Sequence, residues 1–353
     1  MSFTAAGSEE RESGARNQNL QIKGQEAGLL NYIVRRVLYA IPILIGVNLI
    51  TFTLFFVVNS PDDMARMQLG IKRVTPEAIT KWKQERGYDK PLMFNDTEEG
   101  YAKFTHTIFF EKSAAMFAFR FGRADDGRDI AHEIKTRMVP SLAIALPVFL
   151  LGLGVYIVFA LIMVFFRATY VDFWGVVLCV ALMSISGLFY IIGGQFLISK
   201  LWHLVPISGY GSGPDAAKFL VLPVIIGVVS GAGASIRWYR TIFLEEMGKD
   251  YVRTARAKGL PESIVLFRHV LRNALIPILT GAVVVIPLLF LGSLIAESFF
   301  GIPGLGSYTI DAINSQDFAV VRAMVFLGSL LYIVGLILTD ISYTLVDPRI
   351  RLE

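Results

Sequence analysis

Histidine and glutamate side chains are the first candidates for chemistry in this sequence, because they bind metals and transfer protons. The pair His132-Glu133 begins like a zinc-protease motif, but Thr136 replaces the second histidine that the motif requires. The four histidines of the chain are His106, His132, His203 and His269. They are divided between the predicted outer and inner faces of the membrane, so they cannot all meet at one metal ion. We therefore predict no metal site, and surface or packing roles for the histidines.

Nucleotide binding is a second chemistry that the sequence argues against. A phosphate-binding loop needs a glycine five residues before its Gly-Lys pair and Ser or Thr directly after it. Here Phe243 precedes the pair Gly248-Lys249 at that distance, and Asp250 follows it. We predict no nucleotide or other cofactor on this chain, so any ATP that drives it must bind another polypeptide. The single cysteine, Cys179, excludes a disulfide within the chain.

A few polar side chains lie in or beside apolar runs, where ionisable groups are costly and are functional candidates. Glu297 and Asp340 are the acidic ones. For Asp340, an ion pair with a basic residue of a neighbouring helix is the favoured interpretation. Gln195, Ser184 and Ser186 either line a polar pathway or bond across helices, as such residues commonly do. These five residues are the candidates for a translocation pathway.

The elements that must position these residues are six long apolar runs. Hydrophobic residues make up 54% of the 353 residues and charged residues 18%, with a mean hydropathy of +0.57. A soluble domain has about 25% charged residues. Each run exceeds the roughly 20 helical residues that cross a bilayer core, where only helices satisfy an open-ended backbone. The sequence predicts an all-α bundle of six transmembrane helices, at residues 33–58, 140–166, 173–199, 219–240, 275–296 and 320–346.

The distribution of positive charge predicts which side of the membrane each loop faces. Basic residues gather beside the first run, between the second and third, between the fourth and fifth, and after the sixth. The loop 298–319 has none, and the loop 200–218 has only Lys200 and Lys218. Both termini and the segment 237–277 are therefore predicted to be cytoplasmic. The net charge of +4 does not indicate nucleic-acid binding, since no base-stacking or groove-reading motif accompanies it.

Two segments extend beyond the apolar runs. Residues 1–28 are polar and lack the apolar stretch of a signal peptide, so they are predicted to be a disordered cytoplasmic tail before a transmembrane domain at 29–351. Residues 59–139, which we call the insert, follow the first run and should be extracytoplasmic. Thr75 and Pro76 have the types of a helix cap and first helical residue. A second helix is expected at 129–138, leading into the second run.

The charged segment 241–274 has the pattern of two short helices with a break between them. The first is expected at residues 251–258, after which Gly259 supplies the left-handed residue that ends a helix, and Pro261 can open the next. The side chains with least bulk there are those of Ala255, Ala257 and Gly259. We therefore predict that the surface of another protein approaches this backbone closely.

The same segment carries a resemblance to a known family. DYVRTARAKGL followed by RHVLRNALIP resembles the cytoplasmic "EAA" loop of ATP-binding cassette (ABC) importer permeases, most closely the dipeptide/oligopeptide permease family. Arg253 replaces the glutamate of the general motif, as is common in the peptide branch. Segments 202–209 and 297–306 resemble the family's outer turns, and the resemblance covers roughly residues 30–351. The family's ATPase-docking role would fall here on Asp250, Tyr251, Arg253, Ala255, Ala257, Lys258, Gly259 and Leu260.

The resemblance implies the type I ABC importer fold and a permease subunit in the bacterial inner membrane, not an enzyme. The implied partners are a second permease, identical or homologous, two ABC ATPases and a periplasmic solute-binding protein, besides the lipid bilayer. The implied solutes are di- and oligopeptides, with oligosaccharides, nickel complexes and opines as alternatives. Residues 92–121 depart from the family pattern, and a contact with the binding protein, a gate of the outer mouth and a simple insertion remain open for them.

Two other classes of protein deserve comparison. A secondary transporter would usually show two similar halves, and no internal repeat is visible in this sequence. A membrane-embedded enzyme would need clustered catalytic residues, which the scattered histidines and acids do not offer.

Overall fold

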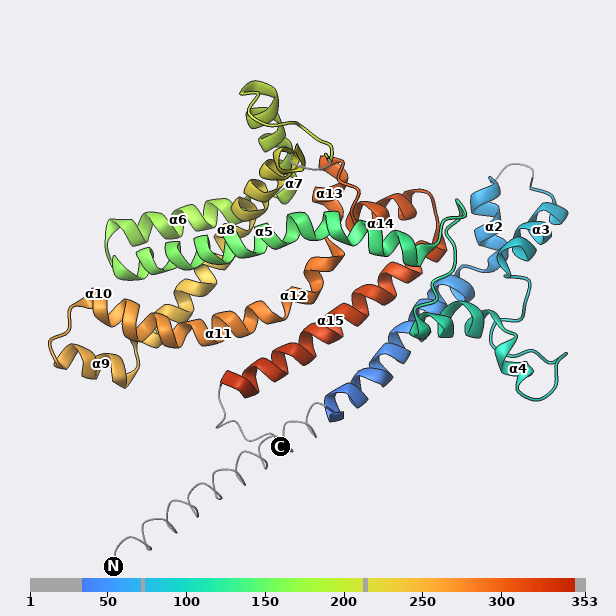
Figure 1. Ribbon diagram of the computed structural model, residues 1–353, viewed down its shortest axis with the longest axis horizontal. Coiled ribbons are helices and arrows are strands. Elements are labelled where there is room, and N and C mark those ends of the chain that lie inside the picture. The colour runs from blue at the N-terminus through green and yellow to red at the C-terminus, as the bar shows by residue number, and fades with distance from the viewer. Residues whose placement is uncertain (1–33, 71–73, 212–214, 347–353) are drawn as a thin grey trace, which may run out of the picture.

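The protein is described here by a computed structural model, which covers residues 34–70, 74–211 and 215–346. Over these residues it is helical and contains no β-strand (Figure 1). Five helical segments are long and apolar enough to cross a membrane: Val34–Val58, α5 (Ile130–Phe165), α8 (Ala216–Met247), Glu262–Leu291 and α15 (Phe318–Val346). The predicted all-α bundle is confirmed. The predicted tail at 1–28 lies outside the described residues.

The third predicted span is not one straight helix, which corrects the sequence-based expectation for 173–199. It consists of α6 (Tyr170–Ser184) and a second part, Gly187–Leu201, which begins with α7 (Gly187–Gly194) and is inclined at 89° to α6. The break occurs because Ile185 is extended, with φ −93° and ψ 128°. Tyr190 Oη donates a 2.8 Å hydrogen bond to the carbonyl oxygen of Leu182, which the break leaves without its helical partner.

The remaining elements are short. Within Glu262–Leu291 they are α10 (Glu262–Ile264), the π-helical turn Val265–Val270, α11 (Leu271–Val283), α12 (Val285–Leu288) and the 3₁₀ turn Leu289–Leu291. The insert contains α2 (Pro61–Leu69), α3 (Pro76–Arg86), α4 (Ala102–Thr105), the π-helical turn Phe109–Ser113 and the 3₁₀ turn Ala114–Ala118. Elsewhere lie α9 (Asp250–Ala257), α13 (Leu294–Phe300) and α14 (Leu305–Asn314).

The first helix and α15 lie side by side and antiparallel, as Figure 1 shows in blue and red. At one end Arg36 Nε lies 3.0 Å from Asp340 Oδ2. At the other end the rings of Phe55 and Phe318 meet edge to face, with their centroids 5.9 Å apart. Contacts at both ends therefore fix the relative positions of the N-terminal helix and the last helix.

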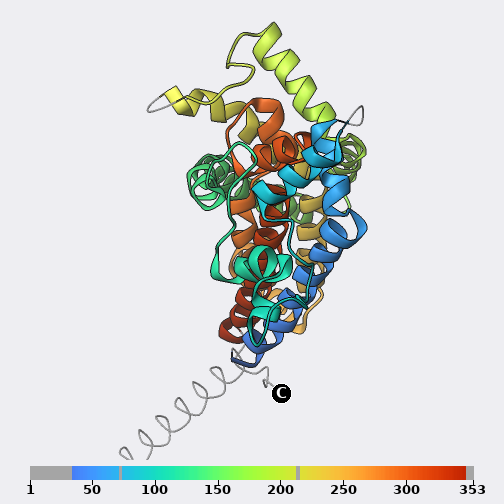
Figure 2. The same cartoon turned by 90° about the vertical axis from the view of Figure 1, so that its right-hand side faces the viewer.

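The insert packs on the end of this helix pair that contains Phe55 and Phe318. Phe52 and Phe56 of the first helix share a buried apolar cluster with Ile79, Trp82 and other insert residues. The prediction for the start of α3 is confirmed, because Thr75 Oγ1 accepts a hydrogen bond from Ala78 N and Pro76 is the first helical residue. The insert lies at the opposite end of the molecule from α9 and α10 (Figure 1), and Figure 2 looks onto the insert.

Helix α8 forms the centre of the bundle and packs closely against α5 and α6. A Cβ added to Gly233 would lie 2.5 Å from the carbonyl oxygen of Cys179 in α6, so only glycine permits this approach. Gly227 is similarly close to Val148 of α5, with a distance of 2.7 Å from its added Cβ. The small residues of the fourth span thus serve helix packing at these two positions.

Candidate coupling surface and transport cavity

The corner between α9 and α10, residues 250–260, is called the coupling corner below. Helix α9 ends in a Schellman motif: Gly259 has φ +76°, its N–H donates to the Arg256 carbonyl over 2.9 Å, and Leu260 N donates to the Ala255 carbonyl over 3.4 Å. The break predicted at Gly259 is confirmed. Pro261 takes the cap position of α10 and Glu262 is its first residue.

Only some of the residues predicted to dock an ATPase are exposed at the coupling corner. The exposed members are Asp250, Arg253, Ala257, Lys258 and Gly259. In contrast Ala255 is 5% exposed and lies in the chain's own apolar core, against which Tyr251 and Leu260 also pack. The expectation that Ala255 keeps the outer surface free of bulk is therefore wrong. Leu260, which the Schellman motif turns back toward α9, packs against the same cluster.

Two contacts fix the coupling corner to the helices on either side of it. Tyr251 Oη donates to Glu246 Oε2 at the end of α8 over 2.7 Å, and burial together with this bond raises the pKa of Tyr251 to about 12. Arg256 forms a two-pronged ion pair with Glu262 of α10, with Nη2–Oε1 at 2.6 Å and Nε–Oε2 at 3.0 Å. Sequence reasoning missed Arg256 and Glu262, although opposite charges on both sides of a glycine break were visible.

A cavity of about 780 Å³ lies inside the bundle, walled by α5, α7, α8, the segment Gly281–Leu289 and α13. Its walls are mainly apolar. The polar groups on it include the hydroxyls of Ser186, Ser230, Ser235 and Ser293. This volume falls in the range of about 300–1,000 Å³ that is typical of small-molecule sites. We call it the transport cavity.

Glu297 borders the transport cavity but is held rigidly by backbone groups. Its side chain is 1% exposed, and its carboxylate accepts from Ser293 N over 3.2 Å and from Ser307 N over 3.1 Å. Ser307 is the third residue of α14, so Glu297 satisfies a free N–H at the start of that helix. Burial raises the pKa of Glu297, while bonds from Ser141, Ser307, Ser293 and Gly306 act in the opposite direction. Its geometry is that of a structural anchor.

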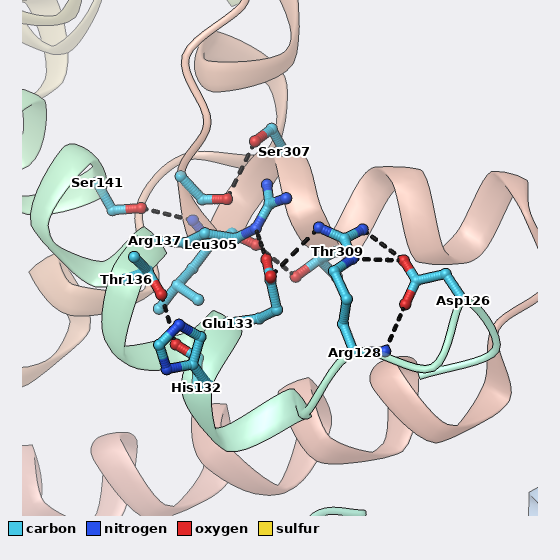
Figure 3. A network of polar contacts seen from close by, with 11 residues as sticks. Asp126, Arg128, His132, Glu133, Thr136, Arg137, Ser141, Leu305, Ser307 and Thr309 are labelled. Atoms are coloured by element: carbon cyan, nitrogen blue, oxygen red, sulfur yellow. Dashed lines mark hydrogen bonds and ion pairs between the residues drawn. The ribbon is translucent and has the colours of Figure 1, made fainter. Parts of the chain in front are cut away.

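Two polar contacts of α5 complete this part of the molecule (Figure 3). Ser141 Oγ accepts a 2.7 Å hydrogen bond from Leu305 N, which is the first residue of α14. Glu133 lies between Arg137 and Arg128, with distances of 2.7 and 3.3 Å between the charged groups. Glu133 is therefore occupied by arginines, and no group of metal-binding side chains occurs among residues 34–70, 74–211 and 215–346. In the incomplete zinc motif His132-Glu133, the glutamate thus belongs to an ion-pair network with Arg128 and Arg137.

The transport cavity brings together two of the five pathway candidates, Ser186 and Glu297. The other three make contacts away from its walls. Ser184 Oγ donates to Val180 O within α6, and Gln195 Nε2 lies 3.1 Å from the carbonyl oxygens of both Ile207 and Phe299. Gln195 thus connects the segments 202–209 and 297–306. Asp340 pairs with Arg36, which confirms the interpretation favoured from the sequence.

If Asp340 serves packing, replacing it should affect stability more than transport. Because both side chains are partly exposed, we expect Asp340→Asn to lower the free energy of unfolding by less than about 1 kcal/mol, and to leave solute uptake within roughly twofold. The double exchange Arg36→Asp with Asp340→Arg should restore stability. A loss of uptake in Asp340→Asn at unchanged melting temperature would instead assign Asp340 to the pathway.

A helical bundle with several membrane-crossing segments, an internal cavity and an exposed corner at one end defines a polytopic membrane transport protein. The family model "Binding-protein-dependent transport system inner membrane component" matches residues 134–352, and the N-terminal model of the same transport systems matches residues 29–122. The chain belongs to this family and has its type I ABC importer permease fold. The second match includes residues 92–121, where the sequence had indicated a departure from the family.

Curated relatives match along almost the whole chain. A di/tripeptide transport system permease protein DppB of Pseudomonas aeruginosa is 31% identical over 350 residues, covering 92% of this chain and 99% of the relative. A putative peptide transport system permease protein of Brucella abortus is 31% identical, with 91% and 99% covered. The dipeptide transport system permease protein DppB of Escherichia coli K12 is 28% identical, with 92% and 99% covered. The protein is thus the membrane component of a binding-protein-dependent transport system that comprises further subunits.

Proposed function

We propose that this chain is the permease of an ATP-driven importer of di- or oligopeptides. It would work in the bacterial inner membrane with a second permease, two ABC ATPases and a periplasmic solute-binding protein. Both termini and the coupling corner would face the cytoplasm, and the insert would face outward. The similarity to permeases named for dipeptide and peptide transport supports the solute class. The single observation that carries the mechanism is the coupling corner, exposed at the end of the bundle opposite the insert (Figure 1).

The coupling corner is connected to two of the elements that wall the transport cavity, α8 and the segment Gly281–Leu289. The Tyr251–Glu246 contact joins it to α8, whose residues Ser230 and Ser235 line the cavity. The Arg256–Glu262 pair joins it to the segment that continues through α11 to Gly281, on another wall. A force on α9 would therefore move two cavity walls together. Such a movement would switch the bundle between two packings, outward open and inward open.

Uptake assays test the energy source and the solute. The chain, expressed with its co-encoded subunits in cells that lack their own peptide permeases, should import a labelled dipeptide only when ATP is present. Uptake that persists on an ion gradient after ATP depletion would indicate a secondary transporter. Competition by an oligosaccharide, a nickel complex or an opine, but not by peptides, would replace the proposed solute by that alternative.

Single cysteines test the pathway. Because the sequence contains one cysteine, Cys179→Ala gives a cysteine-free background. In this background Ser235→Cys, on the wall of the transport cavity, should react with a small polar thiol reagent, and the reaction should block uptake. Ala232→Cys is the matched control, since Ala232 lies in the same helix but is 8% exposed and packed in the core. Equal reaction at both positions would remove the transport cavity from the proposed pathway.

A further inference from the structure

A second cavity, of about 390 Å³, lies between the insert and the start of α15, apart from the transport cavity. It is walled by the end of α3, the turn Phe109–Ser113, the loop before α5 and the first turns of α15. The charged residues on its walls are Glu85, Arg86, Lys112, Arg123, Asp125 and Arg322. Four of these are basic and two acidic, so the cavity has an excess of positive charge. We call it the cationic pocket.

The deepest of these groups, Arg322, is 3% exposed and only partly satisfied. Its Nε donates to the carbonyl oxygen of Phe318 over 3.2 Å, its Nη2 donates to Tyr88 Oη over 3.3 Å, and the guanidinium lies 4.5 Å from the centre of the Phe56 ring. Its Nη1 has no hydrogen-bond partner among the described residues. Leaving a buried charged donor unpaired is costly, so a fold that retains one favours an anionic ligand there.

Lys112 likewise has no counter-ion within ion-pair distance in the described part of the chain, and neither has Arg123, which is exposed at the edge of the cationic pocket. It is half-buried, with Nζ 5.6 Å from the centre of the Tyr88 ring. Burial and, next in importance, the positive charge of Arg322 lower the pKa of Lys112. Lys112 and Arg322 both contact Tyr88, and an anion between them would relieve the repulsion of their charges.

The acidic groups on and beside the cationic pocket either have other partners or lie exposed at the surface. Asp125 pairs with Arg86, with 2.9 Å between Oδ1 and Nη2. Asp317, just before α15, accepts from the backbone N–H groups of Asp125 and Val320 over 2.7 and 3.1 Å. Glu85 is exposed on the surface of α3. None of the three makes an ion pair with Arg322 or Lys112.

We propose that the cationic pocket binds a phosphate-class oxyanion between Lys112 and Arg322. The unpartnered Nη1 of Arg322 would donate charge-assisted hydrogen bonds to such a group, and Lys112 would add a compact charge. Phe56 and Arg322 lie near the insert-side ends of two candidate membrane-crossing segments, Val34–Val58 and Phe318–Ser342, and these ends lie at the outer membrane surface if the chain has the orientation proposed above. The oxyanion is therefore either the phosphate of an outer-leaflet phospholipid or free phosphate from solution. This inference does not depend on the transported solute.

Thermal unfolding of the purified full-length protein tests the proposal. Sodium phosphate is compared with sodium chloride at equal ionic strength in a neutral detergent, and a second arm compares phosphatidylglycerol with an uncharged galactolipid, which has no phosphate, each added to the same detergent. We expect one anionic probe to raise the midpoint of unfolding. Lys112→Gln should weaken the apparent affinity for it at least roughly tenfold, as loss of a charge-assisted hydrogen bond predicts. Arg322→Lys, which keeps the charge but loses the planar fork, should weaken it too.

Lys81→Gln is the matched control, since it removes an exposed lysine of α3 that does not line the cationic pocket. Stabilisation by phosphate in detergent would identify the free ion as the ligand, and stabilisation only by phosphatidylglycerol would identify the headgroup. Lys112→Gln tests the site even if Arg322→Lys fails to fold. Identical responses of Lys112→Gln and Lys81→Gln to both probes, or no response of the unaltered protein, would overturn the proposal.

Discussion

Gly259→Arg should abolish solute uptake while leaving the protein folded in the membrane. Gly259 is exposed at the tip of the coupling corner, and a Cβ added there meets no atom of this chain within 4 Å. An arginine therefore fits the isolated chain but would obstruct a partner that approaches the backbone. We expect uptake to fall at least about tenfold, which a misfit of roughly 1.4 kcal/mol at the docking surface would cause. Dipeptide uptake, normalised to the amount of protein in the membrane, measures it.

The backbone at Gly259 requires a second variant as control. Its φ of +76° is unfavourable for a residue with a side chain, so any substitution costs about 1 kcal/mol or more in the chain itself. Gly259→Asn bears this cost least, because asparagine tolerates the left-handed region. Gly259→Asn should keep most of the uptake, and both variants should be equally abundant. Normal uptake by Gly259→Arg would remove the coupling hypothesis.

The coupling corner shows what local sequence rules can predict. Gly259 and Pro261 were enough to predict the break and both flanking helices, because caps depend on a few neighbouring residues. They were not enough to predict which side chains face outward. Ala255 is buried in an apolar cluster that also contains residues of α8 and α11, and such a cluster depends on residues outside the local motif.

The sequence contained a signal for the break in the third span, but the apolar character of the run outweighed it. Ser184, Ser186 and Gly187 are turn-forming residues in the middle of the run. Overall apolarity favoured one continuous helix, whereas the observed break is stabilised by the bond from Tyr190 to Leu182. Hydropathy measures the cost of placing a segment in lipid, but does not show where neighbouring side chains can satisfy an interrupted backbone.

The surroundings of Glu297 were beyond any local rule. The sequence indicated that Glu297 is an unusual acidic residue at a span end. It did not indicate that Ser141, 164 residues before Leu305, completes the same group of contacts. Gly304 also belongs to this group, because a Cβ added to it would lie 2.2 Å from Glu297 Oε2 and 2.5 Å from Ser141 Oγ.

Gly304→Ala should therefore be strongly destabilising. The backbone of Gly304 has φ −97°, which alanine adopts freely, so the effect would come from the steric clash alone. Glu297 cannot move away without losing its bond from Ser307 N, nor Ser141 without losing its bond from Leu305 N. Overpacking of this kind costs about 1–3 kcal/mol, and the lost hydrogen bonds add to it. We expect the melting midpoint of the purified protein to fall by roughly 5 °C or more.

Gly154→Ala is the matched control, since Gly154 lies in the interior of α5 and its added Cβ meets nothing within 4 Å. It should leave the midpoint unchanged or raise it slightly, as alanine favours a helix over glycine. In the Gly304→Ala background, Glu297→Asp shortens the side chain that carries the carboxylate, and it should recover part of the lost stability. Equal midpoints for Gly304→Ala and Gly154→Ala would show that the Glu297 carboxylate does not pack against Gly304. The role of Glu297 as the anchor of α14 would then fail, and its role as a charge in the transport pathway would become the better explanation.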